Sequence, residues 1–251
     1  MKNGAGRASF PAGPAPARPR HYHRPRALCY HSSMKFEARG LIKIFPAPLF
    51  SGGVALRALD GAAMEAAPGV TGVEGPNGSG KTTLFRALAG IIEADGGQVL
   101  ADGAPAGPEE LRKLAAYCPA NPRNFYFRLT AAENLRFFGA LAGLSPHEAS
   151  ASALALAGRL GLAQADLDRR FDRLSEGNMQ KVSLIRTLSR RARLLLLDEP
   201  FRGLDAAACA GLLELIKETG RDRAVLISSH SPELLRAAAG RIVKMEAGRI
   251  I

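Results

Sequence analysis

Residues 75–82 read Gly-Pro-Asn-Gly-Ser-Gly-Lys-Thr and combine three glycines with a lysine and two hydroxyl side chains. Glycines allow backbone N–H groups to approach phosphate oxygens, because no Cβ atom stands in the way. The ammonium group of Lys81 can lie between the β- and γ-phosphates of a nucleotide, and the hydroxyl of Thr82 can ligate Mg²⁺. The residue types and their spacing therefore predict a nucleotide-binding site.

Two acids, Asp198 and Glu199, follow four consecutive leucines at residues 194–197. Such a run is typical of a strand buried on both faces of a parallel sheet, and open α/β sheets bind ligands at the carboxyl ends of their strands. Asp198 is then placed to hold Mg²⁺, directly or through water, and Glu199 to orient or deprotonate an attacking water molecule. An ordinary strand end can also carry two acids, but together with residues 75–82 they indicate nucleotide hydrolysis.

Strands and helices must position these groups. The apolar residues 70–73 predict a strand directly before the glycine-rich loop, and residues 81–89 predict a helix whose positive dipole end points at the phosphates. Further helices are predicted at residues 131–142, 146–160 and 177–190, and a further strand at residues 224–228. This alternation predicts an α/β fold with a largely parallel sheet.

The last of these helices begins with small and polar residues. Ser175 is a good helix N-cap, and Gly177 leaves backbone N–H groups bare at the helix start. Taken alone, the segment is an ordinary capped helix start.

Together these segments resemble the ATP-binding subunit of an ABC transporter, a family whose signature Leu-Ser-Gly-Gly-Gln precedes a helix. Residues 174–178 read Leu-Ser-Glu-Gly-Asn, and Gly-Leu-Asp ending at Asp205 matches the D-loop of the family. His230 matches the switch histidine, and Phe45 stands where the family has an aromatic ring that stacks on adenine. The resemblance runs from about Met34 to the last residue.

The resemblance implies a P-loop NTPase fold of the ABC type over residues 34–251. We expect a mostly parallel central sheet, an antiparallel β portion and a helical subdomain at about residues 118–190. Two copies, identical or diverged, would meet head to tail, each ATP lying between the glycine-rich loop of one and residues 175–178 of the other. ATP and Mg²⁺ are the expected ligands.

The implied site residues follow from the matched motifs. Glu199 and His230 are the expected catalytic residues, and Thr82 and Asp198 are the expected metal ligands. The expected nucleotide-binding residues are Phe45, Gly75, Pro76, Asn77, Gly78, Ser79, Gly80, Lys81, Thr82, Thr83, Ser175, Gly177, Asn178 and Asp205.

Two positions depart from the family pattern. Glu176 stands where the signature usually has a glycine, and Ala120 stands where many relatives carry a glutamine that links Mg²⁺ and the attacking water to the membrane partner. Ala120 can ligate nothing, and Asn121 is a shorter possible substitute. We therefore expect the chain to be active, with slow turnover. The alternative that it is an adapted cassette, which gates a partner without efficient turnover, is not excluded by the sequence.

Residues 123–135 are similar to those of bacterial exporters that work with ABC-2-type permeases. The run Phe125-Tyr126-Phe127 is either a packed aromatic cluster or a surface that receives a coupling helix of the permease.

The first 33 residues differ in composition from the rest. They contain six Lys or Arg residues and no Asp or Glu, and thus carry over half of the net charge of +11. This basic tail, rich in Pro and Arg, is expected to be disordered. The plainest interpretation is that Met34 is the true start and residues 1–33 are not part of the native protein. A transit peptide, or binding to anionic lipid or nucleic acid, stays open.

Composition also bears on location and partners. The sequence has no run of about 18 apolar residues, so the chain is not expected to span a membrane alone. Its three cysteines lack metal-binding spacing and suit a reducing cytosol. We therefore expect a cytoplasmic ATPase, peripheral on the inner face of the cell membrane, whose partners are a permease and a second ATPase subunit.

The expected function is to power a membrane transporter by ATP-driven dimer closure and reopening after hydrolysis. We expect this transporter to be an exporter. The alternative is a soluble ABC ATPase that acts on the ribosome or on DNA. The chain has one cassette, 93 residues between Lys81 and Ser175, and no heptad run. These features favour the transporter, and nucleic acid is not an expected partner.

Overall fold

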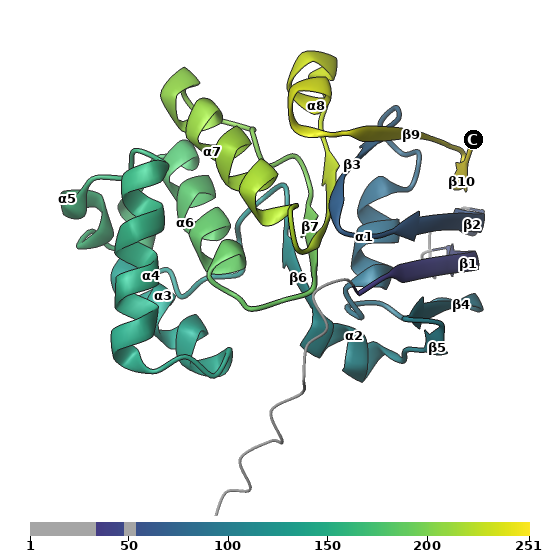
Figure 1. Ribbon diagram of the computed structural model, residues 1–251, viewed down its shortest axis with the longest axis horizontal. Coiled ribbons are helices and arrows are strands. Elements are labelled where there is room, and N and C mark those ends of the chain that lie inside the picture. Colours follow the sequence, from purple (N-terminus) through teal and green to yellow (C-terminus); the bar gives the residue numbers. More distant parts are fainter. Residues whose placement is uncertain (1–33, 48–53) are drawn as a thin grey trace, which may run out of the picture. The chain divides into compact units, whose positions relative to one another are not determined.

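The computed structural model describes residues 34–47 and 54–251, so the expectations for residues 1–33 lie outside the described residues. Two sheets organise the described chain (Figure 1). The four-stranded sheet is antiparallel and has the order β2 (Leu56–Ala66), β1 (Phe36–Phe45), β4 (Gly96–Ala101), β5 (Ala104–Pro105). The six-stranded sheet has the order β10 (Arg249–Ile250), β9 (Arg241–Glu246), β3 (Gly69–Glu74), β8 (Ala224–Ser228), β7 (Leu194–Leu197), β6 (Ala115–Cys118).

The six-stranded sheet is parallel from β9 to β6, and only β10 is antiparallel to its neighbour. The α/β prediction, with a mostly parallel sheet and an antiparallel portion, is therefore confirmed. Because β3, β8 and β7 are adjacent and parallel, their carboxyl ends lie at one edge of the sheet. The loop at residues 75–80 and the acids after residue 197 leave the sheet at this edge.

The leucine run of β7 is buried on both faces, as predicted. Leu195 and Leu197 belong to an apolar core on one face of the sheet, whereas Leu194 and Leu196 belong to a second core on the other face. The first core is closed by α6 (Glu176–Leu188), α7 (Ala206–Thr219) and α8 (Pro232–Ala238). The second core encloses α1 (Lys81–Leu88), which lies between the central strands and the antiparallel sheet.

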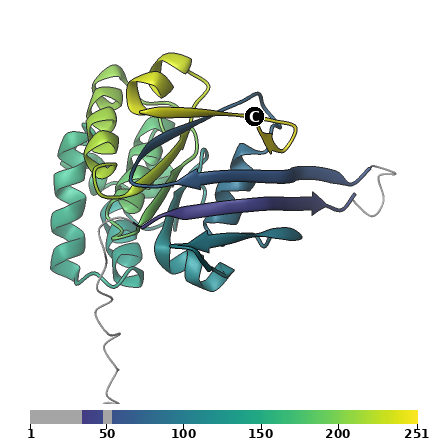
Figure 2. The ribbon, with the colours of Figure 1, turned by 45° about the vertical axis from the view of Figure 1, so that its right-hand side comes forward.

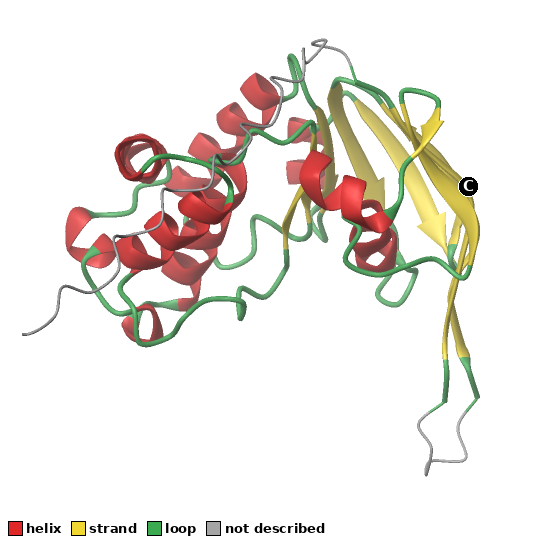
Figure 3. Cartoon of the chain, turned by 90° about the horizontal axis from the view of Figure 1, so that it is seen from below, coloured by secondary structure: helices red, strands yellow, loops and turns green. Residues whose placement is uncertain are grey.

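Helices α3 (Ala131–Leu141), α4 (Pro146–Arg159) and α5 (Gln164–Leu167), with a 3₁₀ turn at Phe171–Arg173, extend the side of the sheet on which α6 lies (Figure 2). Helix α2 (Pro108–Leu114) instead adds Leu111 to the second core, with α1. Thr130 and Ser145 cap α3 and α4 through capping boxes with Glu133 and Glu148. Figure 3 shows many of the helices gathered to one side of the strands and others lying directly against the strands. The predicted helices near residues 131, 146 and 177 are present within two residues of their expected bounds.

Helices α4 and α7 approach closely at Gly211. A Cβ atom at this position would overlap the carbonyl oxygen of Arg159. We expect Gly211→Ala to lower the free energy of unfolding by about 1–3 kcal/mol, because the two helices must move apart. Urea unfolding followed by circular dichroism measures this change.

The matched control is Gly158→Ala in α4. No atom lies within 4 Å of the position that its Cβ would take, so this variant should gain roughly 0.5–1 kcal/mol from the lost freedom of the unfolded chain. Equal effects of the two substitutions would contradict the close packing at Gly211.

The helices were also compared with the length and hydropathy that a membrane span requires. Among residues 34–47 and 54–251, none of the helices reaches both.

Candidate active site

The predicted catalytic and phosphate-binding side chains meet around one cavity of about 370 Å³. It opens at the carboxyl edge of the central sheet, beside the start of α1, the end of β1 and the start of β2. The residues that line it are Phe45, Leu56, Ala58, Asn77, Gly78, Ser79, Gly80, Lys81, Thr82, Thr83, Ala120, Asp198, Glu199, Arg202 and His230.

The loop between β3 and α1 has a backbone that only glycine adopts easily. Gly78 and Gly80 have φ values of 79° and 107°, and a Cβ atom at Gly75 would overlap the carbonyl oxygen of Met245. The buried Lys81 ammonium donates to the carbonyl oxygens of Gly75 (2.6 Å) and Pro76 (3.0 Å), so its side chain curls over the loop. This geometry places the Lys81 ammonium beside a glycine turn whose backbone a phosphate can approach, because no Cβ atom blocks it.

Ser79 adds a polar atom that the described chain leaves unpaired. Its hydroxyl oxygen is buried and has no hydrogen-bond partner among the described residues. Buried hydroxyl groups almost always have a partner, so the orphan group fits a ligand with acceptor atoms, such as a phosphate.

Asp198 is only 2 % exposed and is held by donors from three elements. Its Oδ2 accepts from the Thr82 hydroxyl at 2.7 Å and the Tyr117 hydroxyl at 3.2 Å, and its Oδ1 accepts from the Ser228 hydroxyl at 2.7 Å. The structure thus brings together the two expected metal ligands, Thr82 and Asp198. Sequence reasoning missed Tyr117 and Ser228, although Ser228 is recognisable as the last residue of the strand predicted at residues 224–228.

The oxygen atoms of Thr82 and Asp198 are the hard ligands that Mg²⁺ prefers. No group of three His, Cys, Asp or Glu side chains suited to a metal occurs in the described part of the chain. Mg²⁺ usually takes one or two protein ligands and completes its shell with water and phosphate oxygens. The residues present therefore fit Mg²⁺ bound together with a nucleotide.

Glu199 lies in a backbone conformation that is rare for a residue with a side chain, at φ 50°. Such strain is concentrated at functional sites, where the surrounding structure holds it. The backbone N–H of Glu199 donates to the Ser228 hydroxyl at 3.0 Å, and Glu199 Oε2 accepts from the backbone N–H of His230 at 3.0 Å. Oε1 is buried, accepts no hydrogen bond within the described chain and lies 3.3 Å from His230 Nε2. Glu199 thus keeps one carboxylate oxygen able to accept a proton.

Phe45, at the end of β1, and Leu56, at the start of β2, form an apolar part of the cavity wall. Their place beside the phosphate-binding loop suits a base joined to the phosphates.

The structure does not bring Ser175, Gly177, Asn178 and Asp205 into this cavity, and Gly75 and Pro76 line a neighbouring cavity that shares His230 with it. The Ser175 hydroxyl caps α6 by accepting from the Asn178 N–H at 3.2 Å. The Asp205 carboxylate caps α7 and pairs with the buried Lys181 at 2.9 Å. Within one copy of the chain Ser175 and Asp205 therefore have capping roles, and the contact of these four residues with a nucleotide stays a prediction.

Gly177 has a packing role that the sequence did not reveal. A Cβ atom there would overlap the carbonyl oxygen of Gly203, so the start of α6 lies directly against the turn that follows Glu199. Beside this contact, Arg202 and Glu176 form an ion pair at 3.2 Å. Arg202 also lines the cavity, and sequence reasoning missed it.

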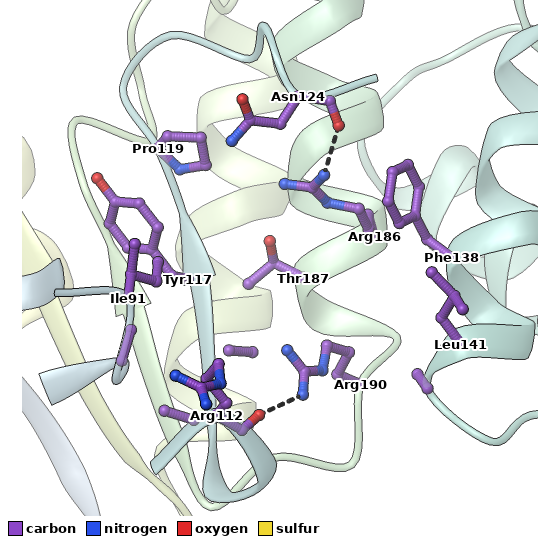
Figure 4. A pocket seen from close by; sticks show the side chains of 14 residues that line it. Ile91, Arg112, Tyr117, Pro119, Asn124, Phe138, Leu141, Arg186, Thr187 and Arg190 are labelled. Carbon is purple, nitrogen blue, oxygen red and sulfur yellow. Dashed lines mark hydrogen bonds between the residues drawn. The ribbon is translucent and has the colours of Figure 1, made fainter. Parts of the chain in front are cut away.

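A groove of about 400 Å³ lies beside this site, between the central sheet and the helices α3 and α6 (Figure 4). Its apolar wall includes Ile91, Phe138 and Leu141. Three arginines, none of which pairs with a carboxylate of the described chain, also line it: Arg112, Arg186 and Arg190.

These guanidinium groups donate to backbone carbonyl oxygens. Arg186 donates to Asn124 at 3.0 Å and Arg190 to Arg112 at 2.9 Å, as Figure 4 shows. Burial lowers the pKa of Arg186 and of Arg190 from the usual range of arginine. Since no described residue that lines the groove is acidic, the groove is cationic.

The aromatic run at residues 125–127 is partly buried and partly exposed. Phe125 is buried and stacks on Phe171, with ring centroids 4.4 Å apart. Tyr126 and Phe127 remain 52 % and 45 % exposed. The run is thus both part of the packed core and part of the surface.

Comparison with known proteins gives consistent matches. The family model described as ABC transporter matches residues 60–202. The chain is 34 % identical to the ABC transporter ATP-binding protein NatA of Bacillus subtilis over 72 % of this chain and 75 % of NatA. It is 35 % identical to the lipoprotein-releasing system ATP-binding protein LolD of Paramagnetospirillum magneticum, over 78 % and 90 % of the two chains.

It is also 35 % identical to the sulfate/thiosulfate import ATP-binding protein CysA of Bordetella parapertussis, over 86 % of this chain but 61 % of CysA. Among solved structures, an ATP-binding subunit of an ABC transporter aligns with a TM-score of 0.74 at 27 % identity, over 86 % and 87 % of the two chains. The dimeric cassette MJ0796 bound to ADP and Pi shares the fold, with a TM-score of 0.75 at 21 % identity over 86 % and 96 %.

Proposed function

This chain belongs to the ABC transporter family as an ATP-binding subunit with ATPase activity, and from that premise we propose that it drives a membrane permease in the direction of export. The observation that carries the proposal is the single cavity shared by the phosphate-binding loop, Asp198, Glu199 and His230. The roles of these residues follow from their contacts.

ATP binding rests on the loop after β3. The Lys81 ammonium would turn from the carbonyl oxygens of the loop to the β- and γ-phosphates, and the unpaired Ser79 hydroxyl would donate to a phosphate oxygen. Phe45 would stack on the adenine ring. Mg²⁺ held by Thr82 and Asp198 would neutralise charge on the phosphates.

Hydrolysis is assigned to Glu199. Its Oε1 would take a proton from water as the water oxygen bonds to the γ-phosphorus, while the bond to the bridging β–γ oxygen breaks and ADP leaves with that electron pair. The His230 N–H holds the other carboxylate oxygen at 3.0 Å, which orients the base. The exposed His230 imidazole would contact the γ-phosphate.

Two copies would close on ATP head to tail. In this arrangement residues 175–178 of one copy, capped by the Ser175 hydroxyl, face the γ-phosphate bound by the other copy. ATP then contacts both subunits in the closed state and one subunit in the open state, so binding favours closure and hydrolysis favours reopening. Asp205, at the start of α7, would lie at the same interface.

The permease would bind on the cytoplasmic side of the membrane, at the groove and at the exposed Tyr126 and Phe127. An ABC-2-type exporter is proposed from the similarity of residues 123–135 to those of such exporters. Among the relatives, LolD belongs to a releasing system and CysA to an import system.

Co-purification tests this function. The full chain with a tag on its C-terminus is extracted in mild detergent, and mass spectrometry identifies its partners. We expect one polytopic membrane protein in near-equal amount, because each cassette needs a permease half to drive. Recovery of ribosomal or DNA-processing proteins without a membrane protein would contradict the transporter and support a soluble ABC ATPase.

A further inference from the structure

Tyr117, in β6, contributes to both the groove and the active site. Its side chain lines the groove next to Ile91 and Pro119 (Figure 4). Its hydroxyl donates to Asp198 Oδ2 at 3.2 Å. One side chain therefore joins the surface open to a partner with a carboxylate placed to hold the metal.

At the active site, the Tyr117 hydroxyl shares its acceptor with Thr82. Both donate to Oδ2 of Asp198, the Thr82 hydroxyl at 2.7 Å, so Tyr117 helps to fix the rotation of this carboxylate. Groups that hydrogen-bond a metal ligand in this way tune metal affinity and orientation.

The neighbours of Tyr117 cannot form this link. Cys118 is buried, and its sulfur lies 3.5 Å from the Ser183 hydroxyl. Pro119 lines the groove and Ala120 lines the cavity, but neither has a side chain that can donate or accept a hydrogen bond. Within residues 117–120, the tyrosine is thus the side chain with polar contact to Asp198.

The charge of the groove indicates what occupies it. Arg112, Arg186 and Arg190 present guanidinium groups without a carboxylate partner, beside an apolar wall. An apolar segment that carries an acidic side chain complements both features.

We propose that Tyr117 is a positioning residue that couples occupation of the groove by an acidic segment of the permease to the orientation of Asp198. The segment would pack against the ring, restrict its rotation and hold the hydroxyl on the carboxylate, so the metal site is better ordered in the complex than in the isolated chain. The coupling to a permease rests on the proposed function, whereas the contact between Tyr117 and Asp198 does not.

Tyr117→Phe removes the hydroxyl and keeps the ring. We expect the Mg²⁺ concentration for half-maximal ATPase activity of the isolated full chain to rise about tenfold. The permease should also stimulate this variant less: the ratio of the ATPase rate of the co-purified complex to that of the isolated chain should fall towards one. A phosphate-release assay over a Mg²⁺ titration measures both quantities, and thermal unfolding checks that the variant is folded.

Two controls separate the link from general damage. Ser152→Ala deletes a hydroxyl in α4 that hydrogen-bonds Ser189 at 3.0 Å, outside the groove and the cavity, and should leave both quantities unchanged. Ile91→Ala alters the groove at a residue that does not line the cavity of Asp198, and should reduce the stimulation while the Mg²⁺ dependence of the isolated chain stays as in the wild type.

The outcomes distinguish this inference from the proposed function. Wild-type Mg²⁺ dependence and wild-type stimulation in Tyr117→Phe would overturn the role of Tyr117, although the transporter function would stand. If the permease does not stimulate the ATPase activity of the wild-type chain, the proposed coupling is overturned. An Mg²⁺ shift in Ile91→Ala as large as that in Tyr117→Phe would also contradict the link through the hydroxyl.

Discussion

Glu199→Gln is expected to lower ATP turnover by roughly 10²- to 10⁴-fold, the range typical of the loss of a positioned general base. The amide keeps the size of the side chain but cannot take a proton from the attacking water. ATP binding should persist, because the loop at residues 75–82 and Asp198 are unchanged. Phosphate release and binding of a fluorescent ATP analogue measure the two effects.

Retained binding without turnover should also favour the closed pair of subunits. Light scattering should show a larger dimer fraction with ATP than with ADP in this variant, since the γ-phosphate contacts both copies. Glu110→Gln, on the exposed surface of α2, is the matched control and should turn over ATP as the wild type does. Turnover by Glu199→Gln at the wild-type rate would exclude Glu199 as the base.

Lys81→Ala should weaken ATP binding by about 10- to 100-fold, because hydrogen bonds to charged groups contribute about 1.5–3 kcal/mol. The ammonium also bridges the carbonyl oxygens of Gly75 and Pro76, so its loss loosens the loop that receives the phosphates. Titration calorimetry with Mg-ATP measures the affinity directly. The rise in melting temperature at a fixed ATP concentration should shrink in parallel.

Lys113→Ala is the control for charge. This lysine is exposed on α2 and pairs with Glu109 at 2.8 Å, away from the cavity. Its replacement removes the same charge and should leave ATP affinity unchanged. Equal losses in the two variants would indicate a general effect of net charge and contradict the assigned role of Lys81.

The parts of this fold that follow local patterns were predictable from the sequence. The alternation of Leu194 to Leu197 between two cores is the direct result of strand geometry, since successive side chains point to opposite faces. The glycine-rich loop, the start of α1 and the capped start of α6 likewise depend on residues close together in the chain.

The parts that depend on long-range contacts were not predictable. Tyr117 and Ser228 donate to Asp198 from two other strands, and their approach depends on the strand order β8-β7-β6. The left-handed conformation of Glu199 likewise depends on the surrounding structure that holds it. The ion pair of Arg202 with Glu176 depends on the packing of α6 against the turn after Glu199, which no local pattern encodes.

The most direct test of this account is an experimental structure of Glu199→Gln with Mg-ATP. We predict two copies head to tail, with the phosphates against Lys81 and Ser79 of one copy and the γ-phosphate facing residues 175–178 of the other. Mg²⁺ should be bound by Thr82 and Asp198, directly or through water. A nucleotide bound away from this cavity, or one whose phosphates contact neither Lys81 nor the second copy, would contradict the account.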